Sequence, residues 1–352
     1  MAAASSPGPT VRKFGFEVRT AWRRRDPGIE ADAIDLWTRN GLLPPDVDPK
    51  QRAGELIAAA YKDGRLAAVS TAAIEYVDAL RARMAVIRGA TDAAFRRSHA
   101  QLSLAVPSRE ALEAWAVANP EERLAGAIAY VTPGEWGDFT RIPVWPESEL
   151  ALAGYAEDGS QVRVRWFQYF RYDQHVSPTP LPSAPPVIAA DVEFRPAWRL
   201  DDSRIEADAI AFWKRLGLLP KDVTPEARAK QLVFVAYRSG RIVGVVTADI
   251  GILPQVRARV AMLRGAVDPE LRRSHVGLAM LLSAPALLET WSRENPHERL
   301  AGFGGILESR ELAAAQSQPY WPMSGLSLIG FTPDGRQIRM SWFKDFRLDG
   351  AS

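Results

Sequence analysis

The alternation of hydrophobic and polar positions is clearest in the second half of the chain. Apolar residues alternate over Val192–Trp198, which predicts a strand, and recur at the helical period over Ile205–Leu216, which predicts a helix ended by Gly217. The further predicted elements are a helix from Thr224, a hairpin turning at Arg238–Arg241, a strand at Arg259–Val267, a helix from about Ser274 to Trp291, a strand at Leu300–Leu307 and two strands around Pro333–Gly335. With a short helix before the last two strands, the order is β α α β β β α β (α) β β. The fold class is α/β with a mixed sheet.

The same pattern occurs twice in the chain. Trp22, Trp37, Trp115, Trp145 and Trp166 each recur 176 positions later, and 176 is half of the 352 residues. The segments IEADAI, RRSH and ERLAG also recur at this offset. We therefore predict a tandem pair of equal domains, because solenoid repeats are shorter and more numerous.

Proline content marks the boundary between the two copies. The segment QHVSPTPLPSAPPVIAAD covers residues 174–191, and its prolines favour an extended, semi-rigid spacer. We predict a flexible N-terminus at 1–15, an N-terminal domain at 16–173, this linker at 174–191 and a C-terminal domain at 192–350.

Composition narrows the classes of function. Lys and Arg number 44 against 42 Asp and Glu, so a nucleic-acid partner is not expected. The absence of cysteine excludes disulfides, Cys-ligated zinc, iron–sulfur clusters and thiol catalysis. The four histidines show no metal-ligand spacing, and no signal segment or membrane-length apolar run is seen. We expect a cytoplasmic protein that uses no metal and has no membrane partner. The G-x-S-x-G, Walker, HExxH and G-x-G-x-x-G motifs are also missing.

One segment carries the signature of an anion site. In MLRGAVDPELRRSHVGLAMLL, a predicted strand leads into a basic stretch and then a helix. The first N–H groups of a helix and the positive end of its dipole bind diphosphate, glycine lets the backbone come close, and arginine adds charge-assisted hydrogen bonds. Arg272 and Gly277 are the residues of this stretch best suited to those two roles.

The element order and this segment together resemble the GNAT superfamily of acyl-CoA-dependent N-acyltransferases, over nearly all of each copy. The family pattern is Arg/Gln-x-x-Gly-x-Gly/Ala; Arg272 fills its first position and Gly277 its last, while His275 stands where the first glycine would be. The resemblance implies acetyl-CoA or another acyl-CoA as donor, and a small-molecule or peptide amine as acceptor. The donor-binding residues that it implies are Val267, Arg272, Arg273, Ser274, His275, Val276, Gly277, Leu278 and Ala279.

The two copies differ where the resemblance places the chemistry. In many members of the family a carboxylate removes a proton from the amine and a tyrosine protonates the departing thiolate, which implies Glu308 as base and Tyr320 as acid. Copy one has Gln101 in place of Gly277, Thr132 in place of Glu308 and Val144 in place of Tyr320. We therefore expect the C-terminal copy to be catalytic and the N-terminal copy to be a degenerate scaffold, paired with it as an intramolecular pseudo-dimer.

Two other interpretations stay open from the sequence. In the first, neither copy is catalytic and the chain is a GNAT-like binding or assembly module. The presence of His275 in place of the glycine keeps this interpretation open. Alternatively, the enzyme takes a longer acyl chain or a carrier-protein donor, which predicts a wide apolar tunnel between the central strands. The identity of the acceptor does not follow from the fold.

Overall fold

The chain folds into two compact units. The computed structural model describes residues 10–132, 134, 136–173, 191–219, 223–271, 275–308 and 317–349. Contacts within the chain divide it after residue 180, and each unit holds one sheet of eight strands. Residues 174–190 of the predicted linker lie outside the described part of the chain. The predicted α/β class with two mixed sheets is confirmed.

The described part of the first unit contains three α-helices and eight strands, besides four short 3-10 helices. The helices are α1 (Pro27–Asn40), α2 (Pro49–Ala53) and α3 (Ala100–Ala118). The strands are β1 (Thr10–Lys13), β2 (Phe16–Thr20), β3 (Leu56–Lys62), β4 (Arg65–Val77), β5 (Ala82–Thr91), β6 (Leu124–Val131), β7 (Ala151–Tyr155) and β8 (Gln161–Trp166).

The second unit repeats this arrangement. Its helices are α4 (Ser203–Leu216), α5 (Pro225–Ala229) and α6 (Val276–Glu294). Its strands are β9 (Val192–Pro196), β10 (Leu232–Arg238), β11 (Arg241–Leu253), β12 (Ala258–Val267), β13 (Leu300–Ile306), β14 (Tyr320–Trp321), β15 (Leu326–Phe331) and β16 (Gln337–Trp342). Helices α4, α5 and α6 begin 176 residues after α1, α2 and α3, so the duplication predicted from the tryptophans is confirmed.

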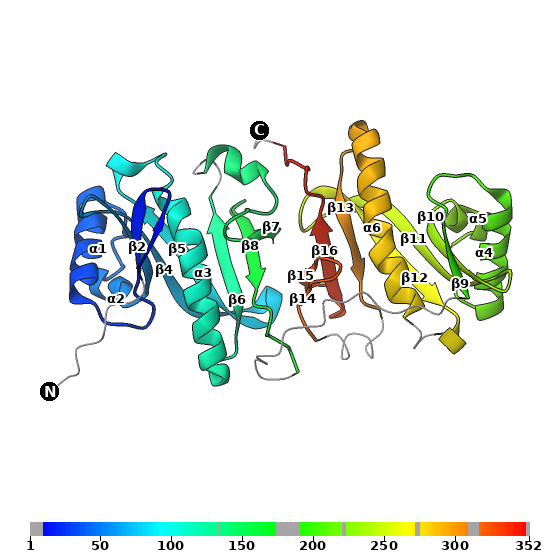
Figure 1. Ribbon diagram of the computed structural model, residues 1–352, viewed down its shortest axis with the longest axis horizontal. Helices are drawn as coiled ribbons and strands as arrows, with labels where there is room; N and C mark the ends of the chain where they lie inside the picture. Colours follow the sequence, from blue (N-terminus) through cyan, green and yellow to red (C-terminus); the bar gives the residue numbers. More distant parts are fainter. Residues whose placement is uncertain are drawn as a thin grey trace. The chain divides into compact units, whose positions relative to one another are not determined.

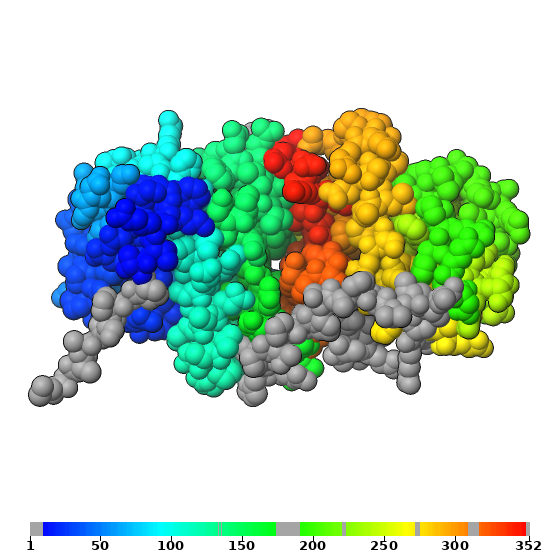
Figure 2. All heavy atoms as spheres, in the orientation of Figure 1, coloured from blue at the N-terminus to red at the C-terminus, as the bar shows by residue number. Residues whose placement is uncertain are grey.

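Each sheet contains one parallel pair of strands. The strand orders are β1-β2-β3-β4-β5-β6-β8-β7 and β14-β15-β16-β13-β12-β11-β10-β9. Only β5–β6 and β12–β13 are parallel among these neighbours. Parallel neighbours need a long crossover, and α3 and α6 supply it by crossing one face of their sheets (Figure 1). The face of the second unit drawn in Figure 2 has α6 at its surface.

Helix α4 ends at Leu216, as predicted, and begins at Ser203, two residues before the predicted start at Ile205. Asp26 and Asp202 cap α1 and α4 by accepting hydrogen bonds from the backbone N–H groups of the first turn. Gly41 and Gly217 end these helices with φ of 60° and 63°, in the left-handed region that glycine enters without steric cost.

The N-terminal segment differs from the prediction. We expected residues 1–15 to be flexible, but Thr10–Lys13 form β1 and pair antiparallel with β2. The two-residue turn between them is Phe14-Gly15, with φ of 52° and 79°. Positive φ at both turn residues gives the tight turn that matches strand twist. The prediction missed it because Phe14 is not a residue typical of such turns.

The two faces of the second sheet have separate cores. Val246 and Leu263 belong to the core under α6, with Met280 of that helix. Val245 belongs to the core under α4, with Trp213. Successive strand residues point to opposite faces, so neighbouring positions on β11 and β12 serve different cores.

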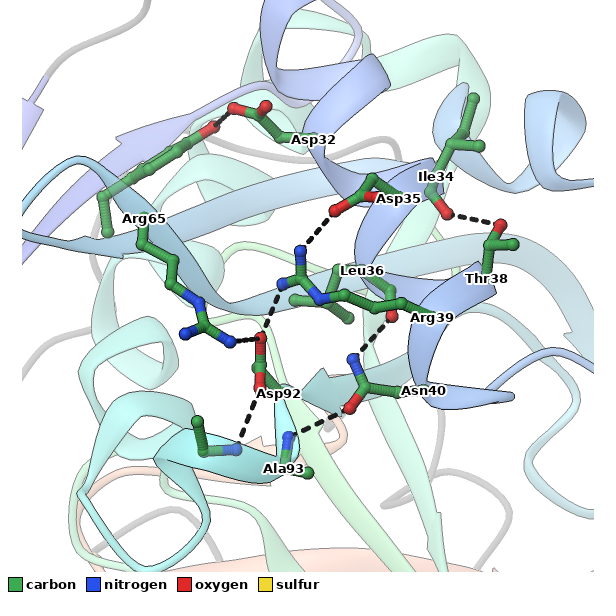
Figure 3. A network of polar contacts seen from close by, with 12 residues as sticks. Asp32, Ile34, Asp35, Leu36, Thr38, Arg39, Asn40, Arg65, Asp92 and Ala93 are labelled. Carbon is green, nitrogen blue, oxygen red and sulfur yellow. Dashed lines mark hydrogen bonds and ion pairs between the residues drawn. The ribbon is translucent and has the colours of Figure 1, made fainter.

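A buried aspartate ties the end of the central strand to a helix in each unit. In the first unit Asp92, 2% exposed, accepts hydrogen bonds from Arg39 Nη2 at 2.6 Å, Arg65 Nη2 at 2.9 Å and the Ala94 N–H at 2.9 Å (Figure 3). The side-chain oxygen of Asn40 accepts a further hydrogen bond, from the Ala93 N–H at 3.1 Å.

The second unit has the same arrangement around Asp268. Arg215 lies 2.9 Å and Arg241 lies 3.9 Å from Asp268 Oδ2, and the Glu270 N–H donates to Oδ1 at 3.3 Å. Burial alone would raise the pKa of Asp268, but these hydrogen bonds and the arginine charges hold it below the ordinary value. The network holds the chain immediately before the predicted anion-binding stretch.

We predict that Asp268→Asn destabilises the second unit by about 1–3 kcal/mol, because a charge-assisted hydrogen bond is lost in a buried site. The thermal midpoint should fall by about 2–4 °C for each kcal/mol, measured by calorimetry. A depressed folded-state pKa contributes stability above pH about 4, and this contribution is lost as the pH falls through the folded value.

The wild type should therefore lose more stability than the variant between pH 5 and pH 3. Asp345→Asn, at an exposed aspartate of the same unit, is the matched control. Equal midpoints for the Asp268 variant and the wild type at every pH would contradict this role.

Candidate functional site

A cavity of about 930 Å³ lies in the second unit and reaches both faces of its sheet. Val246, Leu263 and Leu281 line it from the α6 side, and Trp213 and Val245 line it from the α4 side. Most of the lining residues are apolar, and the volume is near the upper end of that of ordinary small-molecule sites, roughly 300–1,000 Å³. This is also the place, between the central strands, where the alternative with a longer acyl donor predicts a wide apolar tunnel.

The cavity follows from an early end to the parallel pairing. The β12–β13 ladder ends at Met262 and Gly304, whereas the β5–β6 ladder continues one pair further, to Ile87 and Ala129. Gly304 and Gly305 line the cavity; the corresponding residues of copy one are Ile128 and Ala129. Glycine weakens a strand and leaves its backbone accessible, so the glycine pair favours an opening between the strands.

The first turn of α6 borders this opening. The N–H groups of Val276, Gly277 and Leu278 have no carbonyl partner inside the helix, whose first hydrogen bond runs from the Ala279 N–H to the His275 carbonyl. His275 has a φ of 60° and lines the cavity with Gly277 and Leu278. A left-handed residue at this point explains why the family pattern has a glycine here.

Gly277 lies against the end of β12. A Cβ atom at this position would come within 3.1 Å of Val267 Cγ2, and Val267 also lines the cavity. The side chains of Val276 and Ala279 are buried in the core, so these two residues could contribute only through their backbone. Of the donor-binding residues that the resemblance implies, Arg272, Arg273 and Ser274 lie outside the described residues.

The corresponding region of the first unit holds a side chain. Gln101 lies against Gly89, so closely that a Cβ atom at Gly89 would overlap its amide group. Gln101 Oε1 accepts a hydrogen bond from Thr91 Oγ1 at 3.2 Å. The counterparts of Gln101 and Thr91 in the second unit are Gly277 and Val267, which line the cavity. The first unit therefore has a hydrogen-bonded pair of side chains where the second unit has two cavity-lining residues.

Glu308 is placed at the cavity, as the resemblance implies for a base. It follows β13 and is 57% exposed. Arg264 Nε lies 3.7 Å and Arg336 Nη1 lies 3.8 Å from Glu308 Oε1. The carboxylate therefore stands between two cations at the edge of the cavity.

Tyr320 is not brought to the cavity. It lies on β14, a two-residue strand that the sequence did not predict and that pairs with β15. The next residue, Trp321, lines the cavity, and neighbours on a strand point to opposite sides. No tyrosine is found among the described residues that line the cavity.

Three arginines were missed as site residues by the sequence analysis. Arg228, Arg264 and Arg339 all line the cavity. Arg339 is fully buried; its Nη2 donates to the Gln318 carbonyl at 2.6 Å, and its guanidinium lies 4.2 Å from the Trp321 ring centre. For Arg228 and Arg264 a sequence signal exists: acidic residues of the first copy that correspond to nearby positions are replaced by uncharged residues in the second copy.

In the ranges that the structure describes, no group of three or more acidic, histidine or cysteine side chains is placed to hold a metal ion. In the same ranges, no helix has the length and apolar character needed to cross a membrane.

Three solved structures illustrate what the chain is similar to. A GNAT-family acetyltransferase from Streptococcus pneumoniae is 15% identical over 43% of this chain and 99% of its own, with a TM-score of 0.30. The ribosomal-protein-S5-alanine acetyltransferase from Vibrio fischeri is 13% identical over 46% and 98%, with a TM-score of 0.33. The N-acetylglutamate synthase from Neisseria gonorrhoeae, complexed with coenzyme A and N-acetyl-glutamate, is 14% identical over 44% and 36%, with a TM-score of 0.27. No family model and no curated protein matches the sequence.

The fold is assigned from the elements themselves. Apart from the additional strands β1 and β14 and the predicted short helix, both units show the order on which the resemblance was based. In each unit a long helix joins the two strands of the central parallel pair, and in the second unit this helix follows the predicted anion-binding stretch. Each unit therefore has a GNAT-like fold, and the chain is a tandem of two such domains.

Proposed function

We propose that the second unit is an N-acyltransferase that moves an acyl group from acyl-CoA to an amine. The observation that carries this proposal is the cavity of the second unit, which is lined both by the first turn of α6 and by Glu308. The reaction class agrees with the acetyltransferases named above, one of which holds coenzyme A.

The α6 side suits the donor. The N–H groups of Val276, Gly277 and Leu278 would bind the diphosphate of coenzyme A, with Arg272 and Arg273 adjacent in sequence. Gly277 leaves the helix surface open beside Val267, where a side chain would stand in the way. The residues present therefore fit an acyl-CoA at this end of the cavity.

The reaction needs one bond to form and one to break. The amine nitrogen attacks the thioester carbonyl, the C–N bond forms, and the C–S bond breaks to release the thiolate of coenzyme A. Glu308 takes the proton that the amine loses and passes it to solvent. The thiolate takes a proton from solvent, since a thiol with a pKa of about 8.5 is a good leaving group.

The first unit has a different role in this proposal. Gln101, hydrogen-bonded to Thr91, fills the space beside Gly89, and Thr132 replaces the carboxylate. We infer that this unit does not bind coenzyme A and serves as a scaffold. Its pseudo-twofold pairing with the second unit stays a prediction.

Calorimetric titration with acetyl-CoA, and with free coenzyme A for comparison, tests the proposal directly. We expect one site per chain for both ligands, because the N-terminus of α6 is open to the cavity, whereas Gln101 fills the corresponding space at the N-terminus of α3. Two sites would mean that the first unit also binds the donor. No binding of either ligand would favour a non-catalytic module or another acyl donor.

We predict that Gly277→Gln lowers the affinity for coenzyme A by at least about tenfold, because the side chain displaces charge-assisted hydrogen bonds worth about 1.5–3 kcal/mol. Calorimetry measures the affinity, and an unchanged thermal midpoint shows that the fold is retained. Gln101→Gly in the first unit is the matched control and should change the affinity little. Equal losses in the two variants would contradict the asymmetry.

We predict that Tyr320→Phe leaves kcat within about threefold of the wild type, because Tyr320 does not line the cavity and a general acid contributes about 100-fold or more. Steady-state turnover of acetyl-CoA measures this. A fall of about 100-fold with unchanged affinity would restore the acid role that the resemblance implies.

A further inference from the structure

Two arginines line the cavity on the side opposite α6. Arg264 follows Leu263 on β12, and since Leu263 belongs to the core under α6, Arg264 points to the other face of the sheet. Arg228 lies on α5, whose Ala229 belongs to the core under α4. Both arginines therefore lie across the sheet from the helix terminus that suits the diphosphate.

In the first unit the counterparts of these arginines are paired with carboxylates. There Arg52, the counterpart of Arg228, forms an ion pair with Glu55 at 2.9 Å. Arg88, the counterpart of Arg264, forms an ion pair with Glu75 at 3.2 Å. In that unit each arginine has its own carboxylate close by.

The second unit has lost both of these carboxylates. Gln231 replaces Glu55, and Arg228 Nη1 donates to its amide oxygen at 3.0 Å. Gly251 replaces Glu75, and Arg264 instead lies 3.7 Å from Glu308, which Arg336 shares. Among the described residues, no carboxylate forms an ion pair with Arg228.

The charge balance around Arg228 favours an anion. Burial lowers the pKa of Arg228 and the nearby charge of Arg264 lowers it further, while Asp249 and Glu308 act in the opposite direction. The two lowering effects prevail, so Arg228 is a half-buried cation without full compensation. An incoming carboxylate would supply the charge that Glu55 supplies in the first unit.

Apolar side chains lie on the same side of the cavity. Trp213 and Leu219 belong to or pack against the core under α4, and Leu218 and Val223 line the cavity near them. A ligand that reaches the arginines from this side thus meets both cationic and apolar groups.

We propose that the acceptor is an α-amino acid with an apolar side chain, whose carboxylate is bound by Arg228 and Arg264. This inference rests on the proposed function, since its amine would be acylated by the donor held at α6. The apolar side chain lies against Trp213 and Leu219, and Glu308 remains available for the amine proton.

The test compares acceptors that differ only in the carboxylate. Turnover of acetyl-CoA is measured with L-leucine, L-phenylalanine and L-tryptophan, and with isoamylamine, phenethylamine and tryptamine. We expect kcat/KM to be at least about tenfold higher for the amino acid of the preferred pair, the size of one charge-assisted hydrogen bond. Equal values, or higher values for the amines, would overturn the inference.

Two substitutions restore the carboxylates of the first unit. In the variant Gln231→Glu/Gly251→Glu the arginines should regain their partners, so KM for the amino acid should rise about tenfold or more and the preference should disappear. The first unit shows that the fold accepts both acids, and a Cβ atom at Gly251 meets nothing within 4 Å. The variant Glu55→Gln/Glu75→Gln in the first unit is the matched control and should retain the wild-type preference.

Binding of coenzyme A separates this inference from the proposed function. Coenzyme A should bind the wild type and the Gln231→Glu/Gly251→Glu variant with equal affinity, because the arginines lie on the other face. If coenzyme A binds but no amino acid is acylated, and none binds in calorimetry, the acceptor assignment is wrong and the donor site stands. If coenzyme A does not bind the wild type, the proposed function itself fails.

Discussion

The candidate site depends on the point at which two parallel strands stop pairing. Up to Met262 and Gly304 the strands β12 and β13 hold the sheet together, and beyond this pair a cavity passes between them. Strand alternation then gives the opening two chemically different sides, because adjacent residues such as Leu263 and Arg264 face opposite ways. In the proposed reaction, a donor held at α6 and an acceptor held under α4 would meet in this opening.

The duplication separates what keeps the fold from what makes the site. The Asp–Arg network recurs in both units at Asp92 and Asp268. The edge-to-face tryptophan pair also recurs, with ring centres 5.8 Å apart in the first unit and 5.5 Å apart in the second. By contrast, Gly277, Glu308 and Gln231 differ from their counterparts, and all three lie at or beside the cavity. The retained contacts stabilise each unit, whereas the changed residues affect the opening and its charge.

Much of the fold could be predicted because its signals are local. Helical periodicity and capping residues place α4, and the Pro333–Gly335 turn places β15 and β16. The short strands β1 and β14 were missed, since two to four residues carry too little periodicity. The resemblance implied Gly277 and Glu308 as site residues, and both line the cavity. The sequence could not show that Tyr320 and Trp321 point to opposite sides of β14, because this depends on the pairing with β15.

The arginines show why the rest of the site needed three-dimensional information. Arg228 and Arg264 are 36 positions apart, and each resembles an ordinary solvated side chain in the sequence. Only the fold shows that both reach one cavity and that their counterparts in the first unit are paired with glutamates. Arg228 has no carboxylate partner among the described residues, and its partly buried charge is costly unless a ligand supplies the missing anion. The second unit keeps both arginines but not the two glutamates. A role in binding an anionic ligand explains this better than a role in structural ion pairs.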